Sequence, residues 1–329
     1  MDSGVDGETG RATYPGNGEA GRRTPPGRGL QRRAFLVGSA GVLAGCTLQP
    51  QAADDPRPPG AGEKGCLPLA VKVDNVGPAR PHTGLDRADV VHVEQVESGL
   101  SRFLAVYATG RLPEAVGPVR SARESDLDLL GQYGRPVLAY SGAQSKLRPL
   151  IAAAPLEPRT PSQAEGAFYR APDRPAPHNL YVRPARLDPR PAACDPASFG
   201  FRVGPRPPDG KDTPRHTVRY PAARFGFVWS AEDERWRVEL DGEPSALTPS
   251  TVLVQYTRIR DSRFQDRWGS VSPFTETTGS GRVLLLRNGR AYDGRWTRTA
   301  KDRPTDYRTE DGRRLYCAKG QIWVVYVKE

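Results

Sequence analysis

Apolar positions from Leu67 onward fall into short runs. Residues 67–73 form an apolar run, residues 90–96 alternate between apolar and polar positions, and residues 103–107 are apolar and aromatic. Runs of this length and pattern are typical of β-strands. The sequence therefore predicts three strands at the start of the folded part.

A helix is predicted next, at residues 121–133, where apolar side chains recur at helical spacing behind Ser121, which can cap the first turn. A buried strand at 136–140 and a short helix at 144–153 follow. Because strands alternate with helices, we expect an α/β domain over residues 67–200.

The pattern changes after a proline-rich stretch at residues 183–214, where we place a domain boundary. Beyond it strand signals predominate, and Asn288-Gly289 fits a two-residue hairpin turn. The later strands are expected at 225–230, 236–240, 252–259, 283–287 and 322–327. The predicted fold is thus an α/β N-terminal domain followed by a smaller, mostly β C-terminal domain at 215–329, which makes the protein α+β overall.

The N-terminus has the features of an exported lipoprotein. Arg32-Arg33 precede Phe-Leu, as in a twin-arginine export motif, and the apolar run at 34–45 is only 12 residues long. A helix needs roughly 20 residues to span a bilayer, so this run predicts a signal segment at 1–45. It ends at Cys46, whose position resembles a lipidation site. Residues 46–66 then read as a flexible tether. The alternative is a chance apolar segment.

Charge adds an expectation about partners. The net charge is +10, of which +8 lies beyond residue 45. An exported, lipid-anchored protein on the outer face of the cell membrane meets phospholipid head groups and anionic wall polymers, so these partners are favoured over nucleic acid. Arginines outnumber lysines 41 to 7, and the alternative is an ordinary solvated basic surface.

Three cysteines remain beyond the expected lipidation site: Cys66, Cys194 and Cys317. They allow one intramolecular disulfide, and their spacing does not choose the pair. The histidines are scattered and no Cys-x-x-Cys occurs, so the sequence predicts no structural zinc site. No cofactor is required by the sequence, although a divalent cation is compatible with it.

Several strings resemble the YerB-like lipoprotein family. The most distinctive is 117–123, and residues 252–256, 294–296 and 320–323 match more loosely. The other matching strings are 70–75, 79–81, 84–85, 88–91, 94, 97–99, 102–106, 168–170 and 176–181. His82 departs from the glutamine that we expect in relatives. The family has no settled activity, so the resemblance implies architecture and location and leaves the chemistry open.

Acidic residues near strand ends are the candidates for catalysis. Asp74 ends the first strand, where ligands bind in open α/β sheets, but an Asx turn is the alternative. Glu94 and Glu97 could act as acid and base in glycoside cleavage, or hold a hard cation with Asp74. Their alternative role is ion pairing with Arg102 or Arg120.

Basic residues define a candidate anion site. The segment 117–123 brings Arg120, Ser121 and Arg123 to the predicted helix start, and guanidinium forks suit phosphate or carboxylate groups. Alternatively, Ser121 caps the helix and the arginines pair with glutamates. The remaining candidate ligand-binding residues are Asn75, Arg80, Arg102 and Asn179.

His178 is a candidate general acid or base, with Asn179 beside it to orient a ligand. A structural histidine is the alternative, since no nucleophile-elbow or phosphate-binding glycine motif accompanies it. Two functions remain open: a protein that binds an anionic wall polymer, peptidoglycan or a partner protein, and a hydrolase or transferase of envelope glycans or phosphodiesters. A transporter-linked binding protein is a third possibility with only the anchor in its favour.

Overall fold

The computed structural model describes residues 66–329 except 192–193 and 267–268. The expected signal segment 1–45, Cys46 and the tether up to residue 65 lie outside the described residues. In the part of the chain that is described, no helix is long and apolar enough to cross a membrane.

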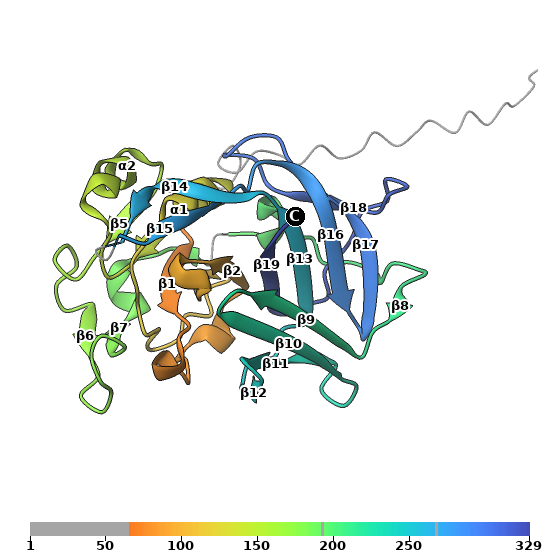
Figure 1. Cartoon of the computed structure of the whole chain (residues 1–329), viewed down its shortest axis with the longest axis horizontal. Coiled ribbons are helices and arrows are strands. Elements are labelled where there is room, and N and C mark those ends of the chain that lie inside the picture. The colour runs from red at the N-terminus through yellow and green to blue at the C-terminus, as the bar shows by residue number, and fades with distance from the viewer. Residues whose placement is uncertain (1–65, 192–193, 267–268) are drawn as a thin grey trace, which may run out of the picture. The chain divides into compact units, whose positions relative to one another are not determined.

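One mixed sheet of 11 strands forms the centre of the described region (Figure 1). In spatial order the strands are β18 (Asp306–Arg308), β17 (Arg290–Arg298), β16 (Gly279–Arg287), β13 (Thr251–Thr257), β19 (Ile322–Lys328), β2 (Val90–Gln95), β3 (Ser101–Tyr107), β1 (Leu69–Asp74), β4 (Val137–Ala139) and β5 (Glu157–Arg159), with β8 (Lys211–Asp212) also paired to β17.

The C-terminal strand β19 joins the two halves of this sheet. It pairs in parallel with β13 on one side and with β2 on the other. Its apolar sequence fits this place, because a central strand is covered on both faces. The sheet therefore continues through both halves of the chain, and a division into separate domains between 200 and 215 stays a prediction.

Smaller elements surround the large sheet. A second sheet has four strands, β9 (Arg215–Tyr220), β10 (Ala223–Ser230), β11 (Arg235–Leu240) and β12 (Glu243–Pro244). Two further pairs are β14 (Ile259–Gln265) with β15 (Val271–Thr275), and β6 (Phe168–Arg170) with β7 (Leu180–Val182). The α-helices are α1 (Glu124–Leu130) and α2 (Arg148–Ala153). The 3₁₀ turns are Gly77–Ala79, Leu85–Arg87, Glu97–Gly99, Gly131–Tyr133, Ser145–Leu147, Pro184–Leu187 and Pro196–Phe199.

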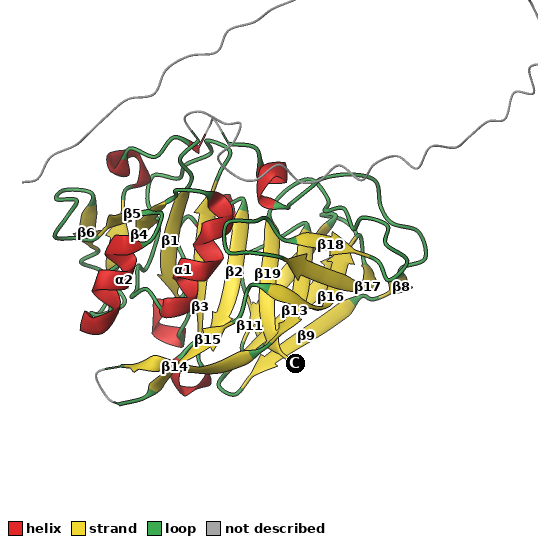
Figure 2. Cartoon of the chain, turned by 90° about the horizontal axis from the view of Figure 1, so that it is seen from above, coloured by secondary structure: helices red, strands yellow, loops and turns green. Residues whose placement is uncertain are grey.

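The layers follow from the two faces of the large sheet. One face packs against the four-stranded sheet, where the Phe103 ring lies 6.1 Å from that of Phe225 on β10, centroid to centroid. On its own sheet Phe103 also contacts Trp323 of β19 at 5.4 Å. The other face is covered by α1 and α2 (Figure 2), through Leu129 and Ile151. Alternating side chains of the strands thus enter two separate apolar cores.

The predicted α/β character of residues 67–200 is only partly right. The region is richer in strands than expected, because β3 pairs antiparallel with both β1 and β2. Residues 96–100, which connect β2 to β3, are too few to hold the crossover helix of a βαβ unit. The helices α1 and α2 have only 7 and 6 residues. The mostly β character of the C-terminal part is confirmed.

Two local predictions have different outcomes. The Asn288-Gly289 hairpin is confirmed: both residues have positive φ, 52° and 71°, between β16 and β17. The helix predicted from Ser121 instead begins at Glu124, because the carboxylate of Asp126 accepts the backbone N–H of Arg123 at 2.6 Å and caps the first turn.

The structure also shows which cysteines form a disulfide, which their spacing in the sequence did not reveal. Cys66 and Cys194 form a disulfide across a sequence separation of 128 residues. Cys317 is a buried free thiol. The disulfide therefore ties the start of the described chain to the end of its N-terminal half.

Candidate functional site

An open cleft of about 920 Å³ lies beside the N-terminal start of β3. Its walls are the turn after β2, the segment before α1, the segment 142–148 that leads into α2, and the β14–β15 hairpin. Three guanidinium groups, those of Arg102, Arg120 and Arg123, come together here, and we call it the guanidinium cleft.

Local backbone geometry explains this convergence. Ser98 and Gly99 have positive φ, so the chain reverses between β2 and β3. The segment before α1 is held against β1, because Arg120 N–H donates to the carbonyl of Lys72 at 2.8 Å. The turn and this segment thus carry Glu97 and the arginines to one place.

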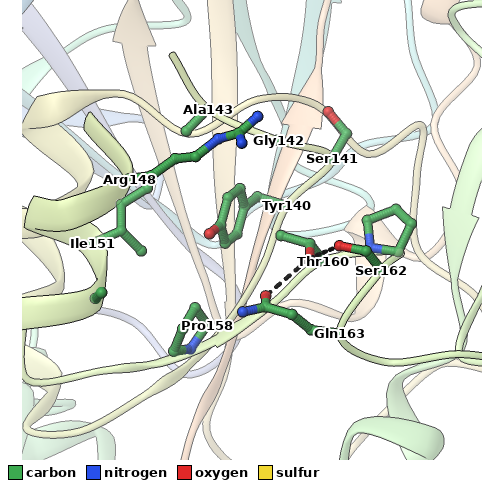
Figure 3. A pocket seen from close by; sticks show the side chains of 12 residues that line it. Tyr140, Ser141, Gly142, Ala143, Arg148, Ile151, Pro158, Thr160, Ser162 and Gln163 are labelled. Carbon is green, nitrogen blue, oxygen red and sulfur yellow. Dashed lines mark hydrogen bonds between the residues drawn. The ribbon is translucent and has the colours of Figure 1, made fainter. Parts of the chain in front are cut away.

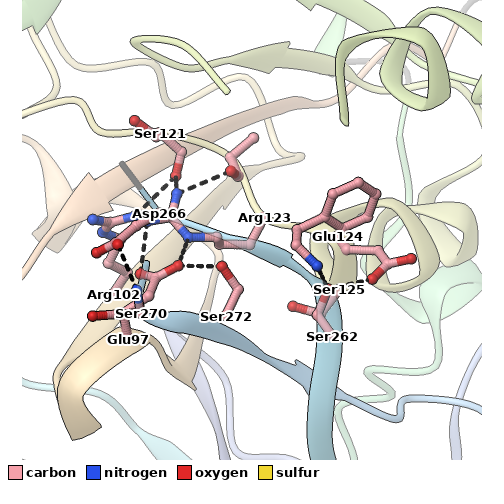
Figure 4. A network of polar contacts seen from close by, with 12 residues as sticks. Glu97, Arg102, Ser121, Arg123, Glu124, Ser125, Ser262, Asp266, Ser270 and Ser272 are labelled. Atoms are coloured by element: carbon pink, nitrogen blue, oxygen red, sulfur yellow. Dashed lines mark hydrogen bonds and ion pairs between the residues drawn. The ribbon is translucent and has the colours of Figure 1, made fainter. Parts of the chain in front are cut away.

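Arg123 is neutralised by Glu97. Its Nε and Nη2 donate to the two carboxylate oxygens at 2.5 and 2.7 Å, and Ser272 of β15 donates to the same carboxylate (Figure 4). Burial alone would raise the pKa of Glu97, but Arg123 and Ser272 outweigh it and lower the pKa to about 2. Glu97 is therefore ionised at neutral pH and serves as a counter-ion.

Arg120 shares a carboxylate with His178. Asp74 is almost fully buried, and its Oδ2 lies 3.0 Å from Arg120 Nε and 2.8 Å from His178 Nδ1. The Arg120 contact is an ion pair that lacks hydrogen-bond alignment. Arg120 lines the cleft, whereas Asp74 and His178 lie behind it.

Arg102 lacks a carboxylate partner in the described residues. It is only 9% exposed, although it stands in register between Asp74 of β1 and Glu94 of β2. Its Nη1 donates to the carbonyl of Ser121 at 3.3 Å, and its Nε has no hydrogen-bond partner there. Burial, followed by the charge of Arg123, lowers the pKa of Arg102 to about 10. The guanidinium stays charged, and although Glu97 and Asp74 act to raise its pKa, neither forms an ion pair with it in the described residues.

Glu94 belongs to a separate buried network. Its side chain accepts from Lys72 at 2.6 Å and from Ser125 at 2.8 Å, and Lys72 also donates to Asp126 at 2.6 Å. All three charged side chains are fully buried. Burial alone would raise the pKa of Glu94, but Lys72 outweighs it and lowers that pKa. Glu94 thus forms a structural ion pair away from the cleft.

Three other candidates contact protein groups outside the cleft. Asn75 donates to Ser101 Oγ at 2.9 Å and accepts from Arg80 Nε at 3.2 Å. Arg80 also pairs with Asp241 at 2.8 Å, which links the loop after β1 to the four-stranded sheet. Asn179 accepts from Arg170 at 2.7 Å. These contacts hold loops together.

The structure therefore brings Glu97, Arg102, Arg120, Ser121 and Arg123 to one cleft, with Asp74 and His178 behind it. Asp74, Glu94 and Glu97, which could have held a cation together, each face a different basic partner. In the described ranges, no cluster of three or more His, Cys, Asp or Glu side chains is placed to hold a metal ion.

Sequence reasoning missed two parts of this region. One is the β14–β15 hairpin, which brings Phe264 and Ser272 to the cleft. The other is the role of Lys72 as partner of Glu94 and Asp126. A lysine inside an apolar strand is itself a signal, because a buried ammonium group needs a carboxylate nearby.

Comparisons with known proteins agree with this picture. Residues 59–195 match the N-terminal domain, and residues 216–324 the C-terminal domain, of a protein family of unknown function, DUF3048. A relative from Bacillus subtilis (strain 168), named "Putative lipoprotein YerB", is 34% identical over 116 residues, which are 35% of this chain and 34% of the relative.

The match thus spans about a third of that relative's length. The crystal structure of YerB from Bacillus subtilis has the same fold, with a TM-score of 0.64 at 20% identity over 80% of this chain and 91% of that one. From the two successive domain matches, the chain belongs to the DUF3048 family, whose members include the YerB-like proteins that the sequence resembles.

Proposed function

We propose that the chain is a lipid-anchored extracytoplasmic protein whose guanidinium cleft binds an anionic ligand of the cell envelope, such as a wall polymer or peptidoglycan. The observation that carries the proposal is Arg102, a guanidinium that is 9% exposed, lines the cleft and lacks a carboxylate partner within the described chain. Burial of an unneutralised charge is unfavourable, and a bound anion would remove that cost.

Three observations support the location. The sequence has the order of a basic pair, a short apolar run and Cys46 that lipoprotein export requires. A relative is named as a lipoprotein. The Cys66–Cys194 disulfide suits an oxidising compartment outside the cytoplasm.

Binding of tripolyphosphate to wild type, Arg102→Met and Arg219→Met tests the proposal. Arg219 is exposed on β9 and serves as the matched control. One charge-assisted hydrogen bond contributes about 1.5–3 kcal/mol, so Arg102→Met should weaken binding roughly tenfold to a hundredfold. Arg219→Met should change it less than twofold.

The stability of the same variants separates binding from folding. Removing an unneutralised buried charge should leave the free energy of unfolding unchanged or raise it. Equal binding by wild type and Arg102→Met would refute the proposed site.

A second candidate is a hydrolase or transferase of envelope glycans or phosphodiesters. The 2.8 Å contact of His178 Nδ1 with Asp74 favours it, because a carboxylate that orients an imidazole is a common general-base arrangement. Turnover of muropeptides or a phosphodiester that disappears in His178→Ala would establish this function. Lack of turnover in wild type would exclude it for those substrates.

A further inference from the structure

A second groove, of about 560 Å³, adjoins the guanidinium cleft. The two share Gly142, Ala143 and Arg148 as lining residues, so they adjoin one another at this segment. A Cβ atom added at Gly142 would meet no atom within 4 Å, which leaves the junction open. A ligand in the cleft can therefore extend into the groove.

The groove differs from the cleft in chemistry. Figure 3 shows Tyr140 at its centre, with Ser141 and the Thr160–Gln163 turn around it. Its polar lining is neutral apart from Arg148. Hydroxyl and amide groups of this kind bind neutral ligands that both donate and accept hydrogen bonds.

Some of these groups have hydrogen-bonding capacity left. Thr160 Oγ1 contacts Ser162 Oγ at 3.1 Å and Gln163 Oε1 at 2.9 Å, which fixes the turn. The side-chain Nε2 of Gln163 and the hydroxyl of Ser141 have no hydrogen-bond partner among the described residues, whereas the backbone N–H of Gln163 donates to the carbonyl of Thr160. Both are thus available to a ligand.

Arg148 stands where the groove meets the cleft. Its side chain is exposed and makes no ion pair within the described ranges. Together with Arg102 it gives the cleft and the groove two guanidiniums that form no ion pair in the described part of the chain, one inside the cleft and one at the junction. The neutral hydrogen-bonding groove therefore has a positive group where it meets the cleft.

We propose that the Tyr140 groove is a saccharide subsite, and that the ligand is an oligosaccharide or longer glycan bearing acidic groups. The acidic group, a phosphate or a carboxylate, binds at Arg102 and Arg148, while a neutral sugar unit contacts Ser141 and Gln163. This inference rests on the proposed anion-binding function and adds the class of molecule that carries the anion.

The test measures affinities of the full-length chain for four probes by calorimetry. Pentamannose 6-phosphate and a hyaluronan hexasaccharide are acidic glycans with phosphate and carboxylate groups respectively. Chitohexaose is a neutral glycan, and tripolyphosphate is an anion without sugar. At least one acidic glycan should bind tenfold or more tightly than chitohexaose and tripolyphosphate do. Whichever acidic glycan binds more tightly shows whether the site prefers a phosphate or a carboxylate.

Variants separate the two parts of the site. Ser141→Ala with Gln163→Ala should weaken acidic-glycan binding about fivefold or more and leave tripolyphosphate unchanged, whereas Arg102→Met should weaken both. Thr297→Ala, exposed on β17 and outside the groove, is the control and should change neither. Thermal unfolding of each variant confirms that it is folded.

The outcomes also separate the two proposals. Tripolyphosphate binding that equals glycan binding, with no effect of the Ser141 and Gln163 changes, overturns the saccharide subsite and keeps the anion cleft. Glycan binding that does not change in Arg102→Met overturns the proposal that the cleft binds an anion.

Discussion

At the residue scale, the protein contains a network of buried charged side chains around Lys72. Lys72 lies among the apolar side chains of β1 with no exposure and contacts both Glu94 and Asp126. Burial lowers the pKa of Lys72, but the two carboxylates outweigh it and raise the pKa. By contrast, burial raises the pKa of Asp126 to about 6. The network is complete only when all three side chains are present.

Substitution of Lys72 by methionine should destabilise the fold by about 3–5 kcal/mol, because it leaves two buried carboxylates without a cation. Lys301→Met is the matched control, since Lys301 pairs with Asp128 on the surface and is 66% exposed. Lys301→Met should lower the free energy of unfolding by about 1 kcal/mol or less. Urea unfolding of both variants measures the difference, and equal losses would contradict the structural role of the network.

The pKa of Glu97 predicts an acid-sensitive stability. Because its pKa falls from about 4.5 in the unfolded chain to about 2 in the fold, its contribution is fully present above about pH 5. The contribution is lost as the pH falls toward 2, and it amounts to about 3 kcal/mol at most. Glu97→Gln should flatten the stability curve between pH 5 and 2. Glu276→Gln, at a more exposed pair with Arg260, should keep the wild-type slope; identical slopes in all three proteins would exclude this role for Glu97.

At the element scale, β19 connects the two halves of the large sheet. Trp323 on this strand is fully buried and contacts the rings of Phe103 and Phe227, at 5.4 and 6.1 Å. One side chain thus packs residues of both halves together.

Trp323→Ala should lower the free energy of unfolding by about 3–5 kcal/mol, because it leaves a large cavity between the two sheets. Trp229→Ala is the control, since Trp229 is partly exposed on β10. Denaturant unfolding should show a clearly smaller loss for Trp229→Ala. A loss at Trp323 no larger than that at Trp229 would show that this core tolerates the cavity.

The elements differ in how well sequence predicts them. Strands such as β1 and β19 follow from apolar runs, β2 follows from alternating apolar and polar positions, and the Asn288-Gly289 turn follows from its backbone requirements. The pairing of β19 with β2 does not follow from the sequence pattern, because it joins residues more than 200 positions apart and no local pattern encodes such a contact. Helix α1 begins later than predicted, because Arg123 is its N-cap residue and the Asp126 carboxylate accepts the backbone N–H of Arg123.

In the candidate site, too, local sequence predicts some features, whereas others depend on contacts between distant residues. The basic segment 117–123 was found from its residue types, whereas the difference between Arg102 and its neighbours depends on which carboxylate each reaches. Glu94 and Glu97 stand three positions apart, yet one lies in the buried Lys72 network and the other faces the cleft. Sequence spacing alone does not decide between these places.

At the scale of the whole molecule, the Cys66–Cys194 disulfide closes a loop of 128 residues. Cross-links over long loops stabilise by about 2–4 kcal/mol. Cys66→Ser should therefore lower the free energy of unfolding by that amount, and Cys317→Ser, at the free thiol, should keep the disulfide intact. Unfolding under non-reducing conditions and peptide mass mapping check both; a Cys317-linked peptide would contradict the pairing.

The proposed anchor gives a prediction for the cell. Cys46→Ala should release the protein from the membrane fraction, because it removes the only cysteine at the end of the apolar run. Cys317→Ser should leave fractionation unchanged. Continued membrane association of Cys46→Ala would rule out lipidation at that position.

The central proposal, that Arg102 meets an anion in the cleft, can be observed directly by NMR of arginine side-chain Nε–Hε signals during a tripolyphosphate titration. The Arg102 signal is assigned from the spectrum of Arg102→Lys. We expect it to shift and saturate with the binding curve, while the signal of exposed Arg219 stays in place. A titration in which exposed arginines shift and Arg102 does not would contradict the anion-binding cleft.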